Sequence, residues 1–483
     1  MPIVKARREL LFFAGYLALM SGLIFALLYR WSYDDPYITY RYARSLAEGQ
    51  GFVYNAGQRV LSTTTVLMVF LLALVKPLPG DLPVWANLFG ALSLALGGWL
   101  LWNLGRAWDA PVAGWLGLLF YPTFPILLHT LGSETPLALA LGLLAFWAYT
   151  HRRYRLTGAA AALAVLARPD TLLVSALLGL HFLAVGRRQG ERLPWAGLGL
   201  YLAILGLWSG FAWAYFGSPL PVTLAAKYYQ GLMPISRRFL DGLLLHARGQ
   251  LSQPYFVVYC LLAAAGLLFA VRRSVRREWL WLLAWPALYI LAYWAMGITS
   301  YPWYYALPAL GLLIAAGLGA DGLWKLARRR LPQAAAWALA AALVGVCAWG
   351  QAAALWQQHT HPDIRAALYR EIGGWLANNT PPDATVGVLE VGMVGYYSRR
   401  TMIDFAGLLQ SDTGRQLLRG TYDETAQWAV QRYRPQYLVL QEYVLPELEN
   451  RLAELNCHKV RRYRAGTLGY PMQITLRQCF YTP

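Results

Sequence analysis

Two adjacent carboxylates, Asp34 and Asp35, stand directly after the first long apolar run of the chain. Neighbouring carboxylates raise one another's pKa, which suits a general base or a metal site. Asp35 also has an ordinary structural role open to it, because an Asp that precedes a proline, here Pro36, commonly caps a helix. Capping accounts for Asp35 alone and leaves Asp34 as the better candidate base.

Further charged residues lie near the ends of later apolar runs. Glu134 opens one such run, with His129 about one turn before it. A carboxylate at membrane depth is costly unless it is paired or functional, although a negative charge also supports a helix N-terminus. Arg168 and Asp170 flank a proline, where a structural salt bridge and a ligand contact are equally good interpretations. All four are candidate substrate contacts.

A single lysine, Lys227, lies in the polar stretch between two apolar runs. It is a candidate partner for an anionic lipid substrate, and its alternative role is to extend toward lipid headgroups. Tyr304 belongs to a tyrosine cluster that resembles an aromatic belt more than a binding site. The remaining candidate substrate contacts are Arg41, Tyr42 and Glu390.

The composition places these residues in a membrane protein. Of the 483 residues, 58% are hydrophobic and 14% are charged, a balance typical of a chain dissolved in lipid. The net charge is +18, but the basic residues form short clusters between apolar runs, which indicates membrane topology and not nucleic-acid binding. The chain lacks a Walker loop, a zinc-ligand cluster and a G-x-S-x-G motif, and Gly392-x-x-Gly395 alone does not indicate a nucleotide site.

The apolar runs predict about eleven transmembrane helices, since about 20 residues cross the hydrocarbon layer. They span residues 10–29, 82–105, 112–131, 134–150, 156–168, 170–186, 194–216, 253–271, 279–297, 303–320 and 333–351. We expect the first to be an uncleaved helix because no small-residue cleavage site follows it. The run 66–75 is too short to span and is predicted to be re-entrant or interfacial.

Leaving 66–75 out of the count determines the topology. All the internal arginine clusters then share one side with the basic N-terminus: Arg106, Arg152, Arg153, Arg187, Arg188, Arg272, Arg273, Arg276, Arg277, Arg328, Arg329 and Arg330. The positive-inside rule predicts a cytoplasmic N-terminus and a C-terminus outside the cytoplasm. We therefore expect the first outer loop, residues 31–80, to lie outside as well.

A more polar region follows the last apolar run. Its helix-like stretch at 365–377 and strand-like stretches at 385–391 and 437–440 predict a small α/β domain. We expect two domains, a membrane domain at 1–356 and an extracytoplasmic α/β domain at 357–483. Outside the cytoplasm, Cys457 and Cys479 are able to form a disulfide.

The segment from Asp34 to Asn55 resembles the first outer loop of GT-C glycosyltransferases related to the mycobacterial terminal arabinofuranosyltransferase. More distant relatives glycosylate lipid A or protein hydroxyls and have an acidic residue that opens a membrane helix, which Glu134 resembles. Similar stretches follow in order over most of the chain, at residues 132–137, 166–170, 217–221, 391–398 and 403–408.

The resemblance implies a GT-C fold and an enzyme of the inner membrane. Such an enzyme takes a sugar from a polyprenyl-phosphate donor and adds it to a hydroxyl of an envelope glycan, lipid or protein. Asp34 or Asp35 is implied as the base. From their charge and position we expect Lys227 and Arg168 to contact the donor phosphate. Glu134 would bind substrate, or share a divalent metal with Asp35. The resemblance does not imply a specific cofactor, and a divalent metal is the one candidate.

One stretch departs from the family pattern. Residues 60–67 read Val-Leu-Ser-Thr-Thr-Thr-Val-Leu, where close relatives often have Val-Glu-Gly-Tyr-Thr-Ser-Pro-Leu, so the sugar and the acceptor stay open. The main alternative function is a transporter or flippase of lipid-linked sugars with an acidic proton relay, although we see no internal repeat of the kind transporters show. An envelope scaffold or sensor is a second alternative and leaves the membrane-level acids unexplained.

Overall fold

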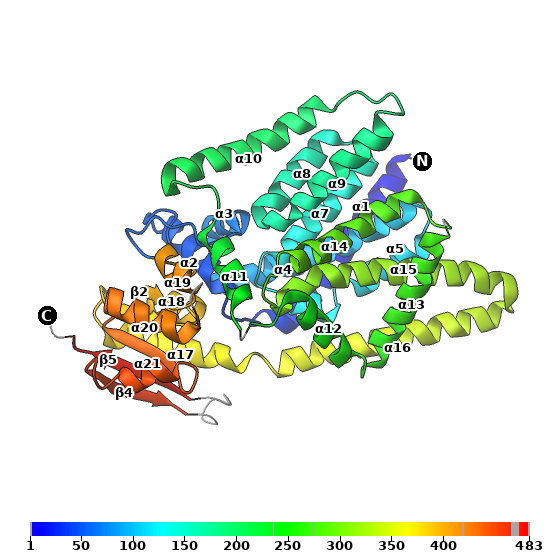
Figure 1. Ribbon diagram of the computed structural model, residues 1–483. Coiled ribbons are helices and arrows are strands. Elements are labelled where there is room, and N and C mark those ends of the chain that lie inside the picture. Colours follow the sequence, from blue (N-terminus) through cyan, green and yellow to red (C-terminus); the bar gives the residue numbers. More distant parts are fainter. Residues whose placement is uncertain (1, 235, 273, 418–419, 465–472, 482–483) are drawn as a thin grey trace.

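The computed structural model describes residues 2–234, 236–272, 274–417, 420–464 and 473–481. Arg273, from one of the predicted basic clusters, lies outside the described residues. Figure 1 shows two parts, a large set of long helices and a small α/β part beside the C-terminus. This division agrees with the change of composition after the last apolar run.

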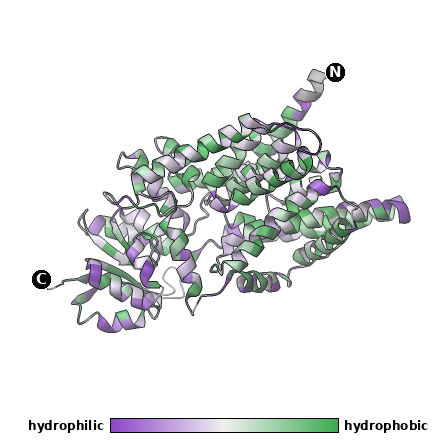
Figure 2. Cartoon of the chain, turned by 45° about the horizontal axis from the view of Figure 1, so that its top comes forward, coloured by the Kyte–Doolittle hydropathy of each residue, from purple (hydrophilic) through white to green (hydrophobic). Residues whose placement is uncertain are grey.

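The long helices follow the apolar runs of the sequence. They are α1 (Pro2–Leu28), α4 (Leu82–Ala107), α5 (Pro111–Phe120), α7 (Thr135–Thr150), α8 (Tyr154–Ala167), α9 (Leu172–His181), α10 (Trp195–Phe216), α13 (Pro254–Val271), α14 (Arg277–Ala295), α15 (Ala306–Arg330) and α16 (Gln333–Thr360). In the described part of the chain, seven stretches are long and apolar enough to cross a membrane. Hydrophobic residues predominate along most of these helices in Figure 2, as expected of a multi-pass membrane protein.

Two predicted segments show how local chemistry sets helix length. α3 (Val66–Val75) covers the apolar run that we predicted to be re-entrant or interfacial, and ten residues at 1.5 Å each span only about 15 Å. The predicted crossing at 112–131 differs from the structure in its second half. There α5 ends at Phe120 and a four-residue helix, α6 (Pro125–Leu128), follows, because Pro122 and Pro125 interrupt the helical hydrogen bonds.

Shorter elements connect the long helices. They are α2 (Pro36–Ala47), α11 (Val222–Leu232), α12 (Phe239–Gln250), the 3-10 turns η1 (Pro169–Thr171) and η3 (Pro302–Tyr305), and the π-helical turn η2 (Phe182–Gly186). α2 and η1 each begin at a proline, which suits the first turn of a helix because its missing N–H has no partner there in any case.

The α/β part contains a five-stranded sheet. Its elements are α17 (Ile364–Asn379), β1 (Thr385–Val388), α18 (Gly392–Ser398), β2 (Thr401–Asp404), α19 (Ser411–Gln416), α20 (Tyr422–Tyr433), β3 (Tyr437–Gln441), α21 (Pro446–Arg451), β4 (Cys457–Tyr463) and β5 (Ile474–Cys479). The strand order is β2-β1-β3-β5-β4, with β1 parallel to β2 and β3, and β5 antiparallel to β3 and β4. β1 and β3 are almost wholly apolar and buried, as central strands covered on both faces should be.

Cys457 and Cys479 face each other across β4 and β5 and form a disulfide. They are 22 residues apart in the sequence, and closing a loop of that size stabilises a fold by about 3 kcal/mol. Replacing both by serine should therefore lower the unfolding temperature of the α/β part, measured by its resistance to proteolysis on heating. A reductant should have the same effect on the parent and none on the variant, and an equal effect on both would contradict the prediction.

The first outer loop packs directly against the α/β part. Arg41 of α2 is buried, and its guanidinium donates to the carbonyl oxygens of Gly395 at 2.8 Å and Arg400 at 2.6 Å. Asn55 exchanges hydrogen bonds with the backbone of Met402, at 2.9 and 3.0 Å. Buried side chains of the loop and of the α/β part belong to one hydrophobic core. The two segments therefore behave as one body, and this body carries Asp34 and Asp35.

Candidate functional site

A cavity of about 540 Å³ lies where the first outer loop meets the membrane helices. The loop contributes Asp35, the N-terminal end of α7 contributes Glu134, and the α8–α9 connection contributes Arg168 and Asp170. Lys227 enters from α11. The structure thus brings together charged residues that the sequence spreads over almost 200 positions, and it adds Tyr304 from η3.

Arg168 organises one wall of this cavity. Its guanidinium contacts Asp170 at 2.6 Å and Glu134 at 3.1 Å, and its side chain is only 12% exposed. It also donates to the hydroxyl of Thr135 at 2.9 Å, while Tyr293 donates to the Asp170 carboxylate at 2.9 Å. One cation held between two carboxylates in a nearly buried setting is a rigid arrangement. We interpret it as a structural support for the cavity wall.

Lys227 is held differently from Arg168. Its ammonium lies 3.8 Å from the ring centre of Tyr301 and 6.0 Å from that of Trp303, a cation–π arrangement. Tyr301 is fixed in turn by its hydroxyl, which donates to Gln230 of α11 at 3.1 Å. No salt bridge to Lys227 is found among the described residues. Its charge therefore stays available for an anionic ligand.

The two adjacent carboxylates have different surroundings. Asp35 occupies the N-cap position of α2, but its side chain makes no capping hydrogen bond and lines the cavity. Asp34 is turned away from the cavity, and its carboxylate accepts hydrogen bonds from the backbone N–H groups of Gly392 at 2.9 Å and Met393 at 2.7 Å. The predicted side-chain cap by Asp35, on which the preference for Asp34 as the base rested, is wrong.

The burial of Asp34 should make stability depend on pH. Burial, and secondly the nearby Glu390 carboxylate, raise the pKa of Asp34 from 3.8 to about 7, against the opposing effect of the two amide hydrogen bonds. The folded state thus holds this proton more tightly than the unfolded state, so the stabilisation is complete below about pH 4 and is lost as the pH rises through about 7. We expect the unfolding temperature to fall between about pH 4 and about pH 7, and Asp34→Asn to flatten this dependence. An unchanged slope in the variant would assign the effect to another group.

Four other predicted site residues lie outside the cavity. Arg41 is used in the packing of the first outer loop, and the Tyr42 hydroxyl donates to the Val60 carbonyl within the same loop. His129 Nδ1 donates to the Pro125 carbonyl oxygen, 2.7 Å away, and the side chain lines a separate cavity. Glu390 accepts a hydrogen bond from Tyr369. These side chains have structural partners and do not reach the cavity of Asp35.

Several lining residues were not singled out from the sequence. Tyr33 and Trp303 stack at 5.6 Å between ring centres, and Tyr293 reaches Asp170 from α14. An aromatic residue in or beside an apolar run looks the same in the sequence whether it faces lipid or a cavity. No sequence signal therefore marked Tyr33, Tyr293 and Trp303. Gly392 belongs to the Gly392-x-x-Gly395 pattern, which was visible in the sequence. A Cβ at position 392 would collide with Asp34. The close approach explains the glycine that the Gly392-x-x-Gly395 pattern contains.

The two candidate metal ligands, Asp35 and Glu134, both line the cavity. One Glu134 oxygen is already engaged by Arg168 at 3.1 Å. No group of three or more His, Cys, Asp or Glu side chains suited to hold a metal ion occurs among the described residues. A hard divalent ion takes six or more oxygen ligands, so the carboxylates of Asp35 and Glu134 fit such an ion incompletely.

Comparison with known proteins bears on the fold of the chain. Residues 355–478 match a family described as a domain of unknown function, DUF8728, and no curated protein matches the chain in sequence. ArnT from Cupriavidus metallidurans, in a crystal structure bound to undecaprenyl phosphate, superposes with a TM-score of 0.63 and 16% identity, covering 96% of this chain and 97% of ArnT. The oligosaccharyltransferase from Archaeoglobus fulgidus in its apo form gives a TM-score of 0.56 and 13% identity over 93% of this chain and 73% of its own length. Both neighbours are GT-C proteins, and the chain therefore has the GT-C fold.

Proposed function

We propose that this protein is an integral-membrane glycosyltransferase. It takes a sugar from a polyprenyl-phosphate-linked donor and transfers it to a hydroxyl of an envelope glycan, lipid or protein. The observation that carries the proposal is that the Asp35 carboxylate and the Lys227 ammonium line one cavity of about 540 Å³, and neither forms a salt bridge with another of the described residues. The presence of undecaprenyl phosphate in the ArnT structure supports a polyprenyl phosphate as the carrier.

The proposed reaction is a single displacement at the anomeric carbon of the donor sugar. Asp35 accepts the proton of the acceptor hydroxyl, whose oxygen forms the new bond to the anomeric carbon. The bond between that carbon and the phosphate oxygen breaks, and the polyprenyl phosphate leaves with the electron pair. Lys227 stabilises the charge that develops on the phosphate. Displacement from the opposite face inverts the anomeric configuration.

The remaining charged residues position these two groups. Arg168, held by Glu134 and Asp170, keeps the membrane side of the cavity in shape and offers a second positive charge to the donor phosphate. In this proposal the first outer loop and the α/β part lie outside the cytoplasm and the N-terminus lies inside it. The arginine clusters at the far ends of the helices support that orientation.

The direct test incubates the purified protein with a panel of polyprenyl-phosphate sugars and measures the release of polyprenyl phosphate. The panel includes an arabinofuranosyl donor, because the first outer loop resembles that of arabinofuranosyltransferases. It also includes aminoarabinose, mannose and other hexose donors. Release that depends on an added acceptor supports transfer. Binding of a donor without release would favour a carrier of lipid-linked sugars instead, and neither binding nor release would reject the proposal.

Replacing Lys227 should mainly weaken the binding of the donor. A hydrogen bond to a charged group contributes about 1.5–3 kcal/mol, so Lys227→Met should raise the KM for the donor by about 10- to 100-fold. Lys227→Arg keeps the charge and should retain much of the affinity, measured in the same assay with donor titration. If both variants behave like the parent, the phosphate is bound elsewhere.

A further inference from the structure

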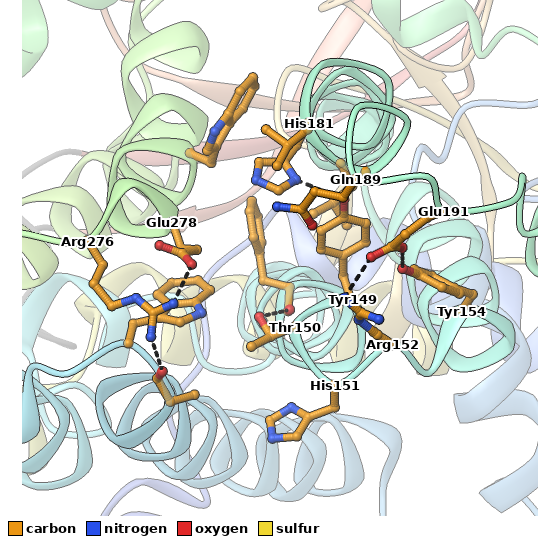
Figure 3. Close-up of a pocket in the computed structure, with 17 residues that line it drawn as sticks. Tyr149, Thr150, His151, Arg152, Tyr154, His181, Gln189, Glu191, Arg276 and Glu278 are labelled. Carbon is orange, nitrogen blue, oxygen red and sulfur yellow. Dashed lines mark hydrogen bonds and ion pairs between the residues drawn. The ribbon is translucent and has the colours of Figure 1, made fainter.

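A second polar cavity lies at the opposite end of α7 from Glu134. It has a volume of about 380 Å³ and is formed by the end of α7, the start of α8, the η2 region and the start of α14 (Figure 3). α7 has 16 residues, so the two cavities are separated by about 24 Å along its axis. The proposed sugar transfer makes no use of this second cavity.

Two ion pairs face this cavity. Arg152 contacts Glu191 at 2.9 Å, and Tyr154 donates to the other oxygen of the same carboxylate. Arg276 contacts Glu278 at 2.9 Å. Figure 3 shows the two pairs on opposite sides, with His181 between them. The cavity thus carries balanced charge of both signs.

The glutamates lie deeper than the arginines. The side chains of Glu191 and Glu278 are 17% and 33% exposed, against 69% for Arg152 and 52% for Arg276. In an ordinary surface salt bridge both side chains are exposed, and the pair contributes little to the stability of the fold. Here the carboxylates are partly withdrawn from solvent, which suits them to accept hydrogen bonds from a cationic group inside the cavity.

An apolar cavity of about 290 Å³ adjoins the polar one. Tyr149, Tyr154 and Leu178 line both cavities. Its far wall is α10, which crosses α8 so closely that a Cβ added at Gly158 or at Gly197 would collide with the facing backbone. Polar and apolar spaces that share a rim form a site for an amphiphile.

The π-helical turn η2 borders both cavities. Phe182 and Leu183 line the apolar one, and Val185 and Gly186 line the polar one. A π-helical turn is less stable than an α-helical turn and often occurs at functional sites. The turn therefore adds independent support for a binding role in this region.

We propose that the joined cavities bind one aminophospholipid with a zwitterionic headgroup, with an acyl chain in the apolar space. The phosphate lies against Arg152, on the side of Tyr154 and the apolar cavity, and the primary ammonium lies across the polar cavity against Glu278. This order follows the lipid, in which the phosphate is closer to the acyl chains than the amine is. An anionic headgroup brings no ammonium to Glu278, and a choline headgroup has no N–H to donate.

The test uses the delipidated full-length protein with phosphatidylethanolamine, phosphatidylglycerol or phosphatidylcholine of matched acyl chains. Binding is measured by native mass spectrometry and by the shift of the unfolding temperature. We expect phosphatidylethanolamine to bind about tenfold more tightly than phosphatidylcholine, the effect of one charge-assisted hydrogen bond. Glu278→Gln should bring this ratio close to one, and Arg152→Gln should weaken the binding of all three lipids.

The matched control is Glu9→Gln, which removes a half-exposed ion pair with Arg106 that does not line either cavity. It should keep the parent's lipid preference. The comparison of three lipids on the parent decides the proposal even if a variant fails to fold. Equal binding of all three lipids, or tighter binding of phosphatidylglycerol, would overturn it, as would an unchanged preference in folded Glu278→Gln. None of these outcomes bears on sugar transfer.

Discussion

Asp35→Asn should lower the rate of sugar transfer by about 10²- to 10⁴-fold, the usual contribution of a general base. The amide has nearly the same shape as the carboxylate and cannot take the acceptor proton. Within the described part of the chain, no side-chain hydrogen bond or ion pair engages Asp35, so the unfolding temperature should hardly change. The measurement is single-turnover release of polyprenyl phosphate at saturating donor, which separates the chemical step from binding.

Asp34→Asn is the matched control, because it changes the neighbouring residue in the same way. The amide nitrogen cannot accept a hydrogen bond, so either Gly392 or Met393 loses its partner at a cost of about 1–3 kcal/mol. We expect a less stable protein whose folded fraction still transfers sugar. The opposite pattern, an active Asp35→Asn beside a folded and inactive Asp34→Asn, would make Asp34 the base.

Arg168→Met should destabilise the protein by about 3–5 kcal/mol, because removing one member of a buried ion pair leaves its partners unpaired. Those partners are Glu134 and Asp170, whose side chains are only 14% and 16% exposed. Thermal unfolding in detergent measures the loss. Donor affinity should fall as well, since the donor phosphate loses the second positive charge of the cavity.

A triple variant separates the two effects of Arg168. Combining Arg168→Met with Glu134→Gln and Asp170→Asn removes the unpaired charges, and replacement of a whole buried ionic group is often close to neutral for stability. We expect stability to return and donor affinity to stay low. If donor affinity returned together with stability, Arg168 would be a structural residue only.

The elements of the fold were predictable wherever a local pattern determines them. The apolar run 66–75 predicted a helix too short to cross the membrane, and α3 covers those residues. Strand-like stretches at 385–391 and 437–440 correspond to β1 and β3, because a central strand is recognisable from its apolar residues alone. Helix ends at prolines were less predictable, as the early end of α5 shows.

The site was predictable as a set of residue types and not as a geometry. The charged residues that line the cavity were all recognised as unusual at membrane depth. The role of each residue depends on contacts between distant segments, such as the hydrogen bond between Asp34 and Gly392, which are 358 positions apart. Arg41 shows the same limit, because a single sequence cannot reveal that the carbonyl oxygens of Gly395 and Arg400 surround its guanidinium.

The packing of the first outer loop on the α/β part has a thermodynamic consequence. Asp35 is carried by that body, whereas Glu134 and Arg168 lie at the ends of α7 and α8, so a donor that contacts both sides holds the two parts together. Ligand that binds only the assembled state stabilises it by mass action. In calorimetry, two separate unfolding transitions should therefore merge into one as the donor concentration rises, and the merging should be lost in Lys227→Met.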